Sequence, residues 1–215
     1  MRKIFFIASA LIATNAAVSA QGPSAIRLRL EPGSLLSISG TSSLHDFTCK
    51  TQKMNVYVDV DPNYTKDLTK ISNPIVSVQV NIPVRNLKCD NGKIDENMYK
   101  TLKADKNAVI TYILSGYDIL AGSASANGFA AKTKGTLTVA GQKHGVDMRV
   151  NARSLGAGKA TAEGEHAVLM TDFGIKPPSF MLGTLKVGNE IKIKFNIKMG
   201  PEMLAQIAAL GSPQK

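Results

Sequence analysis

The stretch IKIKFNIKM, residues 191–199, alternates apolar and polar side chains along its whole length. Successive side chains of a β-strand point to opposite faces of the sheet, so the pattern indicates one buried and one solvated face. Strands of a parallel sheet are buried on both faces and read as continuous apolar runs instead. The stretch therefore predicts an antiparallel sheet, with these residues on its apolar face: Ile191, Ile193, Phe195, Ile197 and Met199.

The same alternation recurs along the chain and predicts further strands. They lie within KMNVYVDV, IVSVQVNIPV, KGTLTVAG and VDMRVNA, at residues 53–60, 75–84, 134–141 and 146–152. In the second of these, the apolar face is predicted to hold Val76, Val78, Val80, Ile82 and Val84.

Glycines mark the predicted connections between strands. GQKHG, residues 141–145, reads as a hairpin loop, and residues 155–166 read as a glycine-rich connection. The middle third is predicted to consist of short pieces, because it is interrupted by Gly116, Gly122, Gly128 and Gly135.

Two segments are predicted to be helical. Residues 95–104 place Met98 and Leu102 four positions apart behind an acidic first turn, and residues 201–210 begin with a proline and carry an apolar stripe. The strand pattern predicts about eight to ten antiparallel strands, which favours a closed barrel or a sandwich. A barrel of about eight strands encloses either a filled core or one small-ligand cavity. The aromatic content of 6%, without girdles, argues against an outer-membrane barrel.

The N-terminus resembles a cleavable signal peptide. Arg2 and Lys3 precede an apolar run, and small residues follow at 18–20, so we expect cleavage before Gln21 and a mature domain of residues 21–215. The apolar run is too short and too polar for a membrane anchor, and no later stretch predicts a membrane-spanning helix. The expected location is therefore the periplasm or the extracellular medium.

Export affects how the two cysteines are interpreted. In an oxidising compartment, Cys49 and Cys89 are expected to form one disulfide. Two free thiols or two ligands of a metal site are the alternatives. The wide separation, without CxxC spacing, is a weak metal signal.

The formal net charge of +10 could suit an anionic partner. The lysines are dispersed, however, and no aromatic platform is interleaved with them, so a nucleic-acid partner is not expected. The sequence is compatible with a homodimer without requiring one.

Few residues of the sequence are candidates for catalysis or metal binding. His45, His144 and His166 occur in separate segments, and neither GxSxG nor HExxH is present. Glu163, Glu165 and His166 could hold a metal, but Glu165 and His166 would face opposite sides of a strand. We expect a binding protein and not an enzyme, with no metal and no cofactor.

The segment TDFGIKPPSFMLG, residues 171–183, is apolar but irregular. Pro177 and Pro178 exclude a helix and disfavour a central strand. Such a loop could line a cavity or close one mouth of a barrel.

Four segments together resemble the YceI-like family of exported, lipocalin-like, polyisoprenoid-binding proteins. They are ISGTSSLHDFTCKT (38–51), the run from residue 80 to 114 that begins VNIPVRNL, GTLTVAGQKHGVDM (135–148), and the run from 171 to 197 that ends KIKFNI. The resemblance implies a single antiparallel barrel of about eight strands with a helix-bearing insertion. It also implies an elongated apolar cavity for an isoprenoid chain, as in quinones or their precursors.

The leading hypothesis is therefore an exported carrier of an isoprenoid or similar amphiphilic lipid. A secreted stress-response or interaction module with a filled barrel is the alternative. His45 is the candidate for contact with a polar head group. The predicted ligand-binding residues are Phe47, Val78, Val80, Leu137, Val139, Phe173, Phe180, Met181, Phe195 and Ile197.

Overall fold

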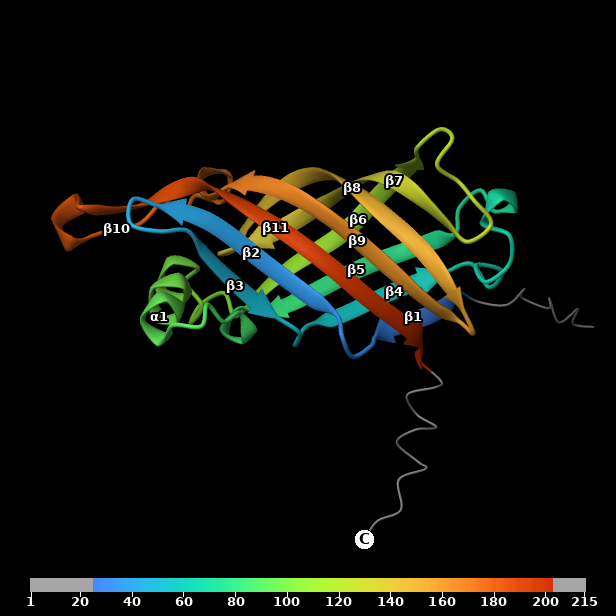
Figure 1. Ribbon diagram of the computed structural model, residues 1–215, viewed down its shortest axis with the longest axis horizontal. Coiled ribbons are helices and arrows are strands. Elements are labelled where there is room, and N and C mark those ends of the chain that lie inside the picture. The colour runs from blue at the N-terminus through green and yellow to red at the C-terminus, as the bar shows by residue number, and fades with distance from the viewer. Residues whose placement is uncertain (1–24, 203–215) are drawn as a thin grey trace, which may run out of the picture.

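The computed structural model describes residues 25–202, apart from the side chain of Met181 (Figure 1). Its strands are β1 (Ile26–Leu30), β2 (Leu35–Ser42), β3 (Phe47–Thr51), β4 (Asn55–Val60), β5 (Ile75–Pro83), β6 (Val109–Ile119), β7 (Gly128–Val139), β8 (Gln142–Gly156), β9 (Lys159–Leu169), β10 (Ser179–Phe180) and β11 (Leu185–Pro201). The helices are α1 (Gly92–Thr101) and the 3₁₀ turns η1 (Leu68–Lys70), η2 (Val84–Asn86), η3 (Met170–Phe173) and η4 (Met181–Gly183).

The strands form a closed antiparallel barrel. The order β1-β4-β5-β6-β7-β8-β9-β11 returns to β1, because β1 also pairs with β11. The long strand β11 pairs with β1 near its C-terminal end and with β2 along the rest of its length. β1 in turn pairs with β4, and β2 pairs with β3. β1 with β2, and β3 with β4, therefore each occupy one strand position, and the barrel has eight positions in all. This confirms the predicted all-β barrel.

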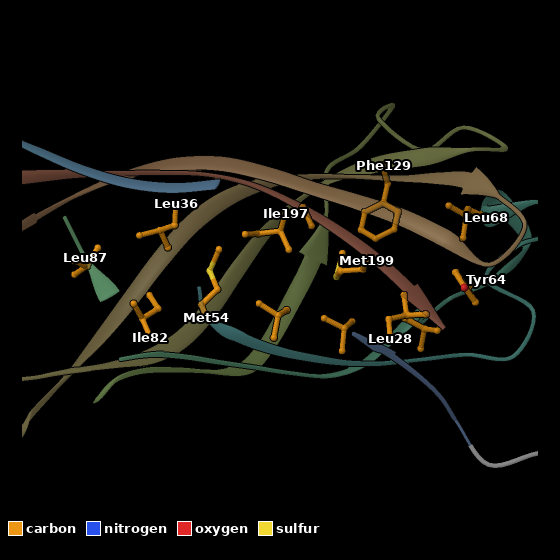
Figure 2. Packing of buried hydrophobic residues seen from close by; sticks show 14 residues of the cluster. Leu28, Leu36, Met54, Tyr64, Leu68, Ile82, Leu87, Phe129, Ile197 and Met199 are labelled. Carbon is orange, nitrogen blue, oxygen red and sulfur yellow. The ribbon is translucent and has the colours of Figure 1, made fainter. Parts of the chain in front are cut away.

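The long strand β11 behaves as its alternation predicts. Ile197 and Met199 are buried, whereas the lysines between the apolar residues are exposed. Figure 2 shows Leu36, Ile197 and Met199 pointing into the space that the strands enclose. One strand face thus supplies part of the inner wall.

The predicted inward face of β5 is wrong at Val76, which is 61% exposed. The pairing of β4 with β5 shifts between Asp59–Ser77 and Val60–Ile75, so Val76 lies in a bulge. An extra residue in one strand reverses the alternation beyond it. Ile75 consequently replaces Val76 on the inner face, where it packs against the core.

The predicted hairpin between two alternating strands is confirmed by the pairing of β7 with β8, but its loop does not extend over 141–145, because the chain turns earlier and more tightly. Ala140 and Gly141 have φ of 49° and 81°, as two-residue type I′ turns require, and β8 begins at Gln142. A second such turn at Ala157 and Gly158 replaces the predicted long connection.

The glycines of the middle third do not divide it into short strands, contrary to expectation. Gly116 lies inside β6 and Gly135 inside β7, which have 11 and 12 residues. A Cβ at position 135 would lie 2.5 Å from the ring atoms of Tyr112. Glycine here lets an aromatic ring from the neighbouring strand lie against the backbone.

Helix α1 confirms the predicted helical insertion, but it begins at Gly92 and not at residue 95. The Asn91 side chain accepts hydrogen bonds from the backbone N–H groups of Lys93 and Ile94, which caps the first turn. Of the predicted C-terminal helix, Pro201 ends β11, and residues 203–215 lie outside the described part of the chain. Within residues 25–202, no helix has the length and apolarity needed to cross a membrane.

The Cys49–Cys89 disulfide is present, as predicted. Cys49 lies in β3, the last strand of the sheet order, and Cys89 follows η2. Beside the disulfide, the backbones of Lys50 and Lys88 exchange hydrogen bonds of 2.7 and 2.9 Å. The disulfide thus joins the edge of β3 to the segment that leads into α1.

A glycine beneath an aromatic ring gives a first test of the packing. A Cβ at Gly164 would lie 2.7 Å from both the Arg149 carbonyl oxygen and the Phe195 ring. Because backbone cannot yield easily, we expect Gly164→Val to lower the free energy of unfolding by about 1–3 kcal/mol in urea titrations. Gly145→Val is the matched control, since nothing lies within 4 Å of a Cβ there. Equal losses in the two variants would contradict this account.

Candidate ligand-binding cavity

The barrel encloses a cavity of about 890 Å³. This lies near the upper end of the range usual for small-molecule sites, about 300–1,000 Å³. Aliphatic and aromatic side chains from both halves of the barrel form most of its wall, among them Val58, Val80, Leu137 and Phe195. Such a lining favours an apolar ligand over a highly polar one.

One end of the cavity is covered by the segment between β4 and β5. Tyr64 and Leu68 from this segment are 4% and 6% exposed, and the Tyr64 hydroxyl donates a hydrogen bond to the Gly158 carbonyl. Phe129 and Tyr117 belong to the same core cluster, and their rings stack with centroids 6.4 Å apart. Aromatic and aliphatic side chains thus line this end of the cavity. The segment between β4 and β5 that covers it lies on the right in Figure 1.

The other end carries the helix and the longer loops, and we call it the mouth. Figure 1 shows α1, the β2–β3 turn and β10 gathered there, on the left. The cavity-lining polar residues from these elements are Ser42, His45, Lys93, Asn97 and Thr101. The mouth therefore adds a group of polar side chains to the cavity wall.

The structure brings nine of the ten predicted ligand-binding residues to this one cavity. They come from strands far apart in sequence and from the irregular segment: Phe47, Val78, Val80, Leu137, Val139, Phe173, Phe180, Phe195 and Ile197. The side chain of Met181 lies outside the described part of the chain. That these residues contact a ligand stays a prediction.

The irregular segment 171–183 packs partly inside the barrel. Phe173 and Ile175 are 2% and 6% exposed, and they form a second apolar cluster with Leu137, Ala140 and Val146. Phe180 forms the two-residue strand β10 with Ser179 and also lines the cavity. The segment therefore both fills one corner and lines the mouth.

The three histidines have different surroundings. His45 lies exposed at the mouth, where its Nδ1 donates to the Asp46 carbonyl at 3.0 Å. His144 lies outside the cavity, 3.9 Å from the Asp172 carboxylate. His166 is half-buried in β9 and lines the cavity, whereas Glu163 and Glu165 point outward. These glutamates and His166 do not converge, and no metal-binding group of three His, Cys, Asp or Glu occurs among residues 25–202.

Two tyrosines add hydroxyl groups to the inner wall. Burial raises the pKa of Tyr112 and of Tyr117, so both remain protonated at neutral pH. The Tyr112 hydroxyl donates to Thr133 Oγ1 at 3.5 Å, and Tyr117 accepts from the Ile75 N–H at 3.0 Å. Sequence analysis did not select Tyr112 or Thr133, and it considered His166 only as a possible metal ligand. The alternation of side chains along β9 could have identified His166 as an inward residue, since it shares a strand face with Ala162 and Val168.

A model of the YceI-like domain matches residues 33–199. The chain belongs to the YceI-like family. This confirms the resemblance drawn from the four segments. No curated protein matches the sequence.

Solved structures share the YceI-like fold at low sequence identity. Burkholderia cenocepacia BcnA is 18% identical with a TM-score of 0.61, covering 77% of this chain and 95% of its own. A polyisoprenoid-binding domain from Saccharophagus degradans, implicated in plant cell wall breakdown, is 13% identical with a TM-score of 0.62, covering 82% and 99%. The Campylobacter jejuni YceI protein is 17% identical with a TM-score of 0.53, covering 71% and 82%. At these identities the likeness concerns the fold.

Proposed function

We propose that this YceI-like protein is an exported carrier that holds an isoprenoid or similar amphiphilic lipid in its barrel. The observation that carries the proposal is the apolar cavity of about 890 Å³ inside the closed barrel. The similar Saccharophagus degradans domain is described as polyisoprenoid-binding, which supports the same ligand class.

Burial of an apolar chain is sufficient to explain binding. Each buried CH₂ group contributes about 0.8 kcal/mol, so an isoprene unit would contribute about 4 kcal/mol before the cost of ordering the chain. A few buried units would give useful affinity with few polar contacts. The wall therefore selects for chain length and shape.

The cavity argues against the alternative of a filled barrel, which would have no such space. The arrangement of polar groups favours binding over catalysis. His45 lies at the mouth and His166 on the wall of β9, and no three His, Cys, Asp or Glu side chains converge among the described residues.

Export is part of the proposal. The signal peptide predicted at residues 1–20 lies outside the described residues. The Cys49–Cys89 disulfide supports an oxidising compartment, since such bonds persist mainly in exported proteins. A periplasmic carrier would move a membrane lipid that is too apolar to diffuse through water alone.

The direct test is to purify the mature protein from the periplasm, extract it with organic solvent and analyse the extract by mass spectrometry. We expect a polyprenyl or quinone-like species in near-stoichiometric amount. An extract without lipid, from folded protein that also takes up no lipid from vesicles, would overturn the proposal.

Phe180→Asp should remove most of the retained lipid, because it places a carboxylate at the mouth of the apolar cavity, where the chain would lose contact. Ser179→Asp is the matched control, since Ser179 is the outward-facing neighbour on β10. Lipid per mole of protein in the same extraction is the measurement, with far-UV circular dichroism to verify folding. Equal retention by both variants would exclude Phe180 from the site.

A further inference from the structure

The two most exposed large apolar side chains among residues 25–202 both lie on loops at the mouth of the barrel. Leu44 belongs to the β2–β3 turn (residues 43–46) and is 71% exposed, and Leu182 belongs to the β10–β11 loop (residues 181–184) and is 109% exposed. We call this turn and this loop the mouth loops. Figure 1 shows them at the left end of the molecule. A single exposed leucine needs no explanation, but two at the opening of an apolar cavity indicate an interaction surface.

Hydrogen bonds join the two mouth loops. The Ser43 N–H donates to the Lys186 carbonyl at 2.9 Å, and the Lys186 N–H donates to Ser43 Oγ at 3.0 Å. Ser43 Oγ in turn donates to the Thr184 carbonyl at 3.1 Å. Leu44 directly follows this junction in the chain, and Leu182 precedes it by two residues. The two exposed leucines therefore belong to one connected surface.

The backbone holds both leucines in these exposed positions. The Ser42 hydroxyl accepts from the N–H groups of Leu44 at 3.3 Å and His45 at 3.2 Å, which fixes the turn. Leu182 has φ of 55° and ψ of 31°, a left-handed conformation that leucine rarely adopts. Such conformations persist only where the surroundings impose them, and they concentrate at functional sites.

The cavity extends to the mouth loops. Phe180 and Leu185 stand on either side of the β10–β11 loop and line the cavity. Ser42 and Phe47 stand on either side of the β2–β3 turn and line it as well. A lipid chain that leaves the cavity here would come out beside the two exposed leucines.

Basic side chains accompany the β10–β11 loop. Lys176 and Lys186 are exposed, and neither forms an ion pair with another residue of the described chain. No Asp or Glu occurs from residue 173 to residue 189, and Asp46 is the one acidic residue of the mouth loops. The formal net charge of the whole chain is +10. Exposed lysines beside apolar side chains suit a surface of anionic lipids.

We propose that the mouth loops dock the barrel on the anionic surface of a lipid bilayer. In this position Leu44 and Leu182 enter the layer of lipid chains, and Lys176 and Lys186 meet the phosphates of the head groups. A bilayer fits this surface better than a protein partner does, because two protruding side chains bury far less than the roughly 800 Å² per partner of a stable protein interface.

Docking in this orientation has a consequence for transfer. The mouth would lie against the membrane that supplies or receives the lipid, so an apolar chain could enter or leave the cavity without crossing water. This transfer step rests on the proposed carrier function. The docking surface itself does not depend on what the cavity holds.

The chain contains no tryptophan, which allows a direct test. Leu182→Trp places a single tryptophan on a mouth loop. Leu155→Trp is the matched control, since Leu155 is 59% exposed and lies near Gly158, which the Tyr64 hydroxyl contacts at the covered end of the barrel. With vesicles of equimolar phosphatidylglycerol and phosphatidylcholine, tryptophan emission should move to shorter wavelength in Leu182→Trp and stay unchanged in Leu155→Trp.

Substituting the leucines measures their contribution to docking. We expect the double variant Leu44→Ser and Leu182→Ser to bind the same vesicles about tenfold more weakly in cosedimentation, because the inserted apolar surface is lost. Leu155→Ser should bind as the unmodified protein does. Far-UV circular dichroism would verify that all variants remain folded.

Substituting the lysines tests the preference for anionic lipid. Unmodified protein should bind vesicles with phosphatidylglycerol more tightly than vesicles of phosphatidylcholine alone, and salt should reduce the difference. The double variant Lys176→Glu and Lys186→Glu should lose this preference. Lys66→Glu is the matched control, because Lys66 is exposed in the segment that covers the other end of the barrel.

The outcomes separate docking from the carrier function, because the lipid retained by periplasmic protein is measured without vesicles. If vesicles leave the emission of Leu182→Trp unchanged, or shift both tryptophan variants equally, the docking surface is overturned while the carrier function stands. A shift that appears without vesicles and grows with protein concentration would assign the mouth loops to a second copy of the chain, and would also overturn the proposal. So would a crosslinker at position 44 that captures one periplasmic protein from a variant that binds no vesicles.

Discussion

Replacing Cys49 and Cys89 together with serine should lower the free energy of unfolding by about 4 kcal/mol. The disulfide closes a loop with a sequence separation of 40 residues, which restricts the unfolded chain. It also joins β3, the last strand of the sheet order, to the segment that follows η2. We expect the double variant to unfold at a lower urea concentration, and the local effect to be greatest at β3 and α1.

Reduction provides the control for this prediction. Adding dithiothreitol to the unmodified protein should give the same loss as the double substitution, and it should have no effect on the double variant. Hydrogen exchange of the β3 amides would locate the change. A loss below about 1 kcal/mol would show that the Lys50–Lys88 backbone pairing and the surrounding packing hold this edge without the disulfide.

Filling the cavity should abolish most lipid binding without unfolding the barrel. Ala162 faces the cavity from β9 and packs against the core cluster. A phenyl ring at this position would occupy roughly the room of one isoprene unit, whose burial contributes about 4 kcal/mol before ordering costs. We therefore expect Ala162→Phe to reduce squalene and ubiquinone affinity by at least about tenfold.

Ala167→Phe is the matched control, because Ala167 lies on the same strand and is exposed on the outer face. It should bind both lipids as tightly as the unmodified protein. Thermal unfolding of both variants would verify that they remain folded. If the two variants bind lipid equally well, the space beside Ala162 is not where the chain lies, and the cavity assignment would have to be revised.

Strand composition and the inner face of β11 were predictable from local sequence. In IKIKFNIKM, each apolar residue is followed by a polar one, so the buried and the solvated face of the strand can be predicted without knowing the partner strands. The same reasoning identified Val78, Val80, Leu137, Val139, Phe195 and Ile197, all of which line the cavity. Phe173 and Phe180 were predicted from the irregular segment 171–183 instead. The disulfide followed from the presence of two cysteines in a chain predicted to be exported.

Positions that depend on how strands pair could not be predicted in this way. The exposure of Val76 results from a bulge between β4 and β5, which is a property of two strands and not of one. The turns at Ala140–Gly141 and Ala157–Gly158 are shorter than the glycine spacing suggested, because β8 and β9 continue their pairing up to the turn residues. Gly135 is explained only by the ring of Tyr112 on the neighbouring strand.

The sequence by itself determined an antiparallel all-β fold with one apolar strand face, because alternation is a local property that each strand carries independently. The single barrel was implied by the resemblance to the YceI-like family. The tertiary structure alone decided that the interior is hollow, and that Thr133, Met148 and His166 lie in one row across its wall. A cavity depends on the combined volume of side chains from every strand, and a row across strands depends on register. Both depend on contacts between residues that are far apart in sequence, so no single stretch of sequence specifies them.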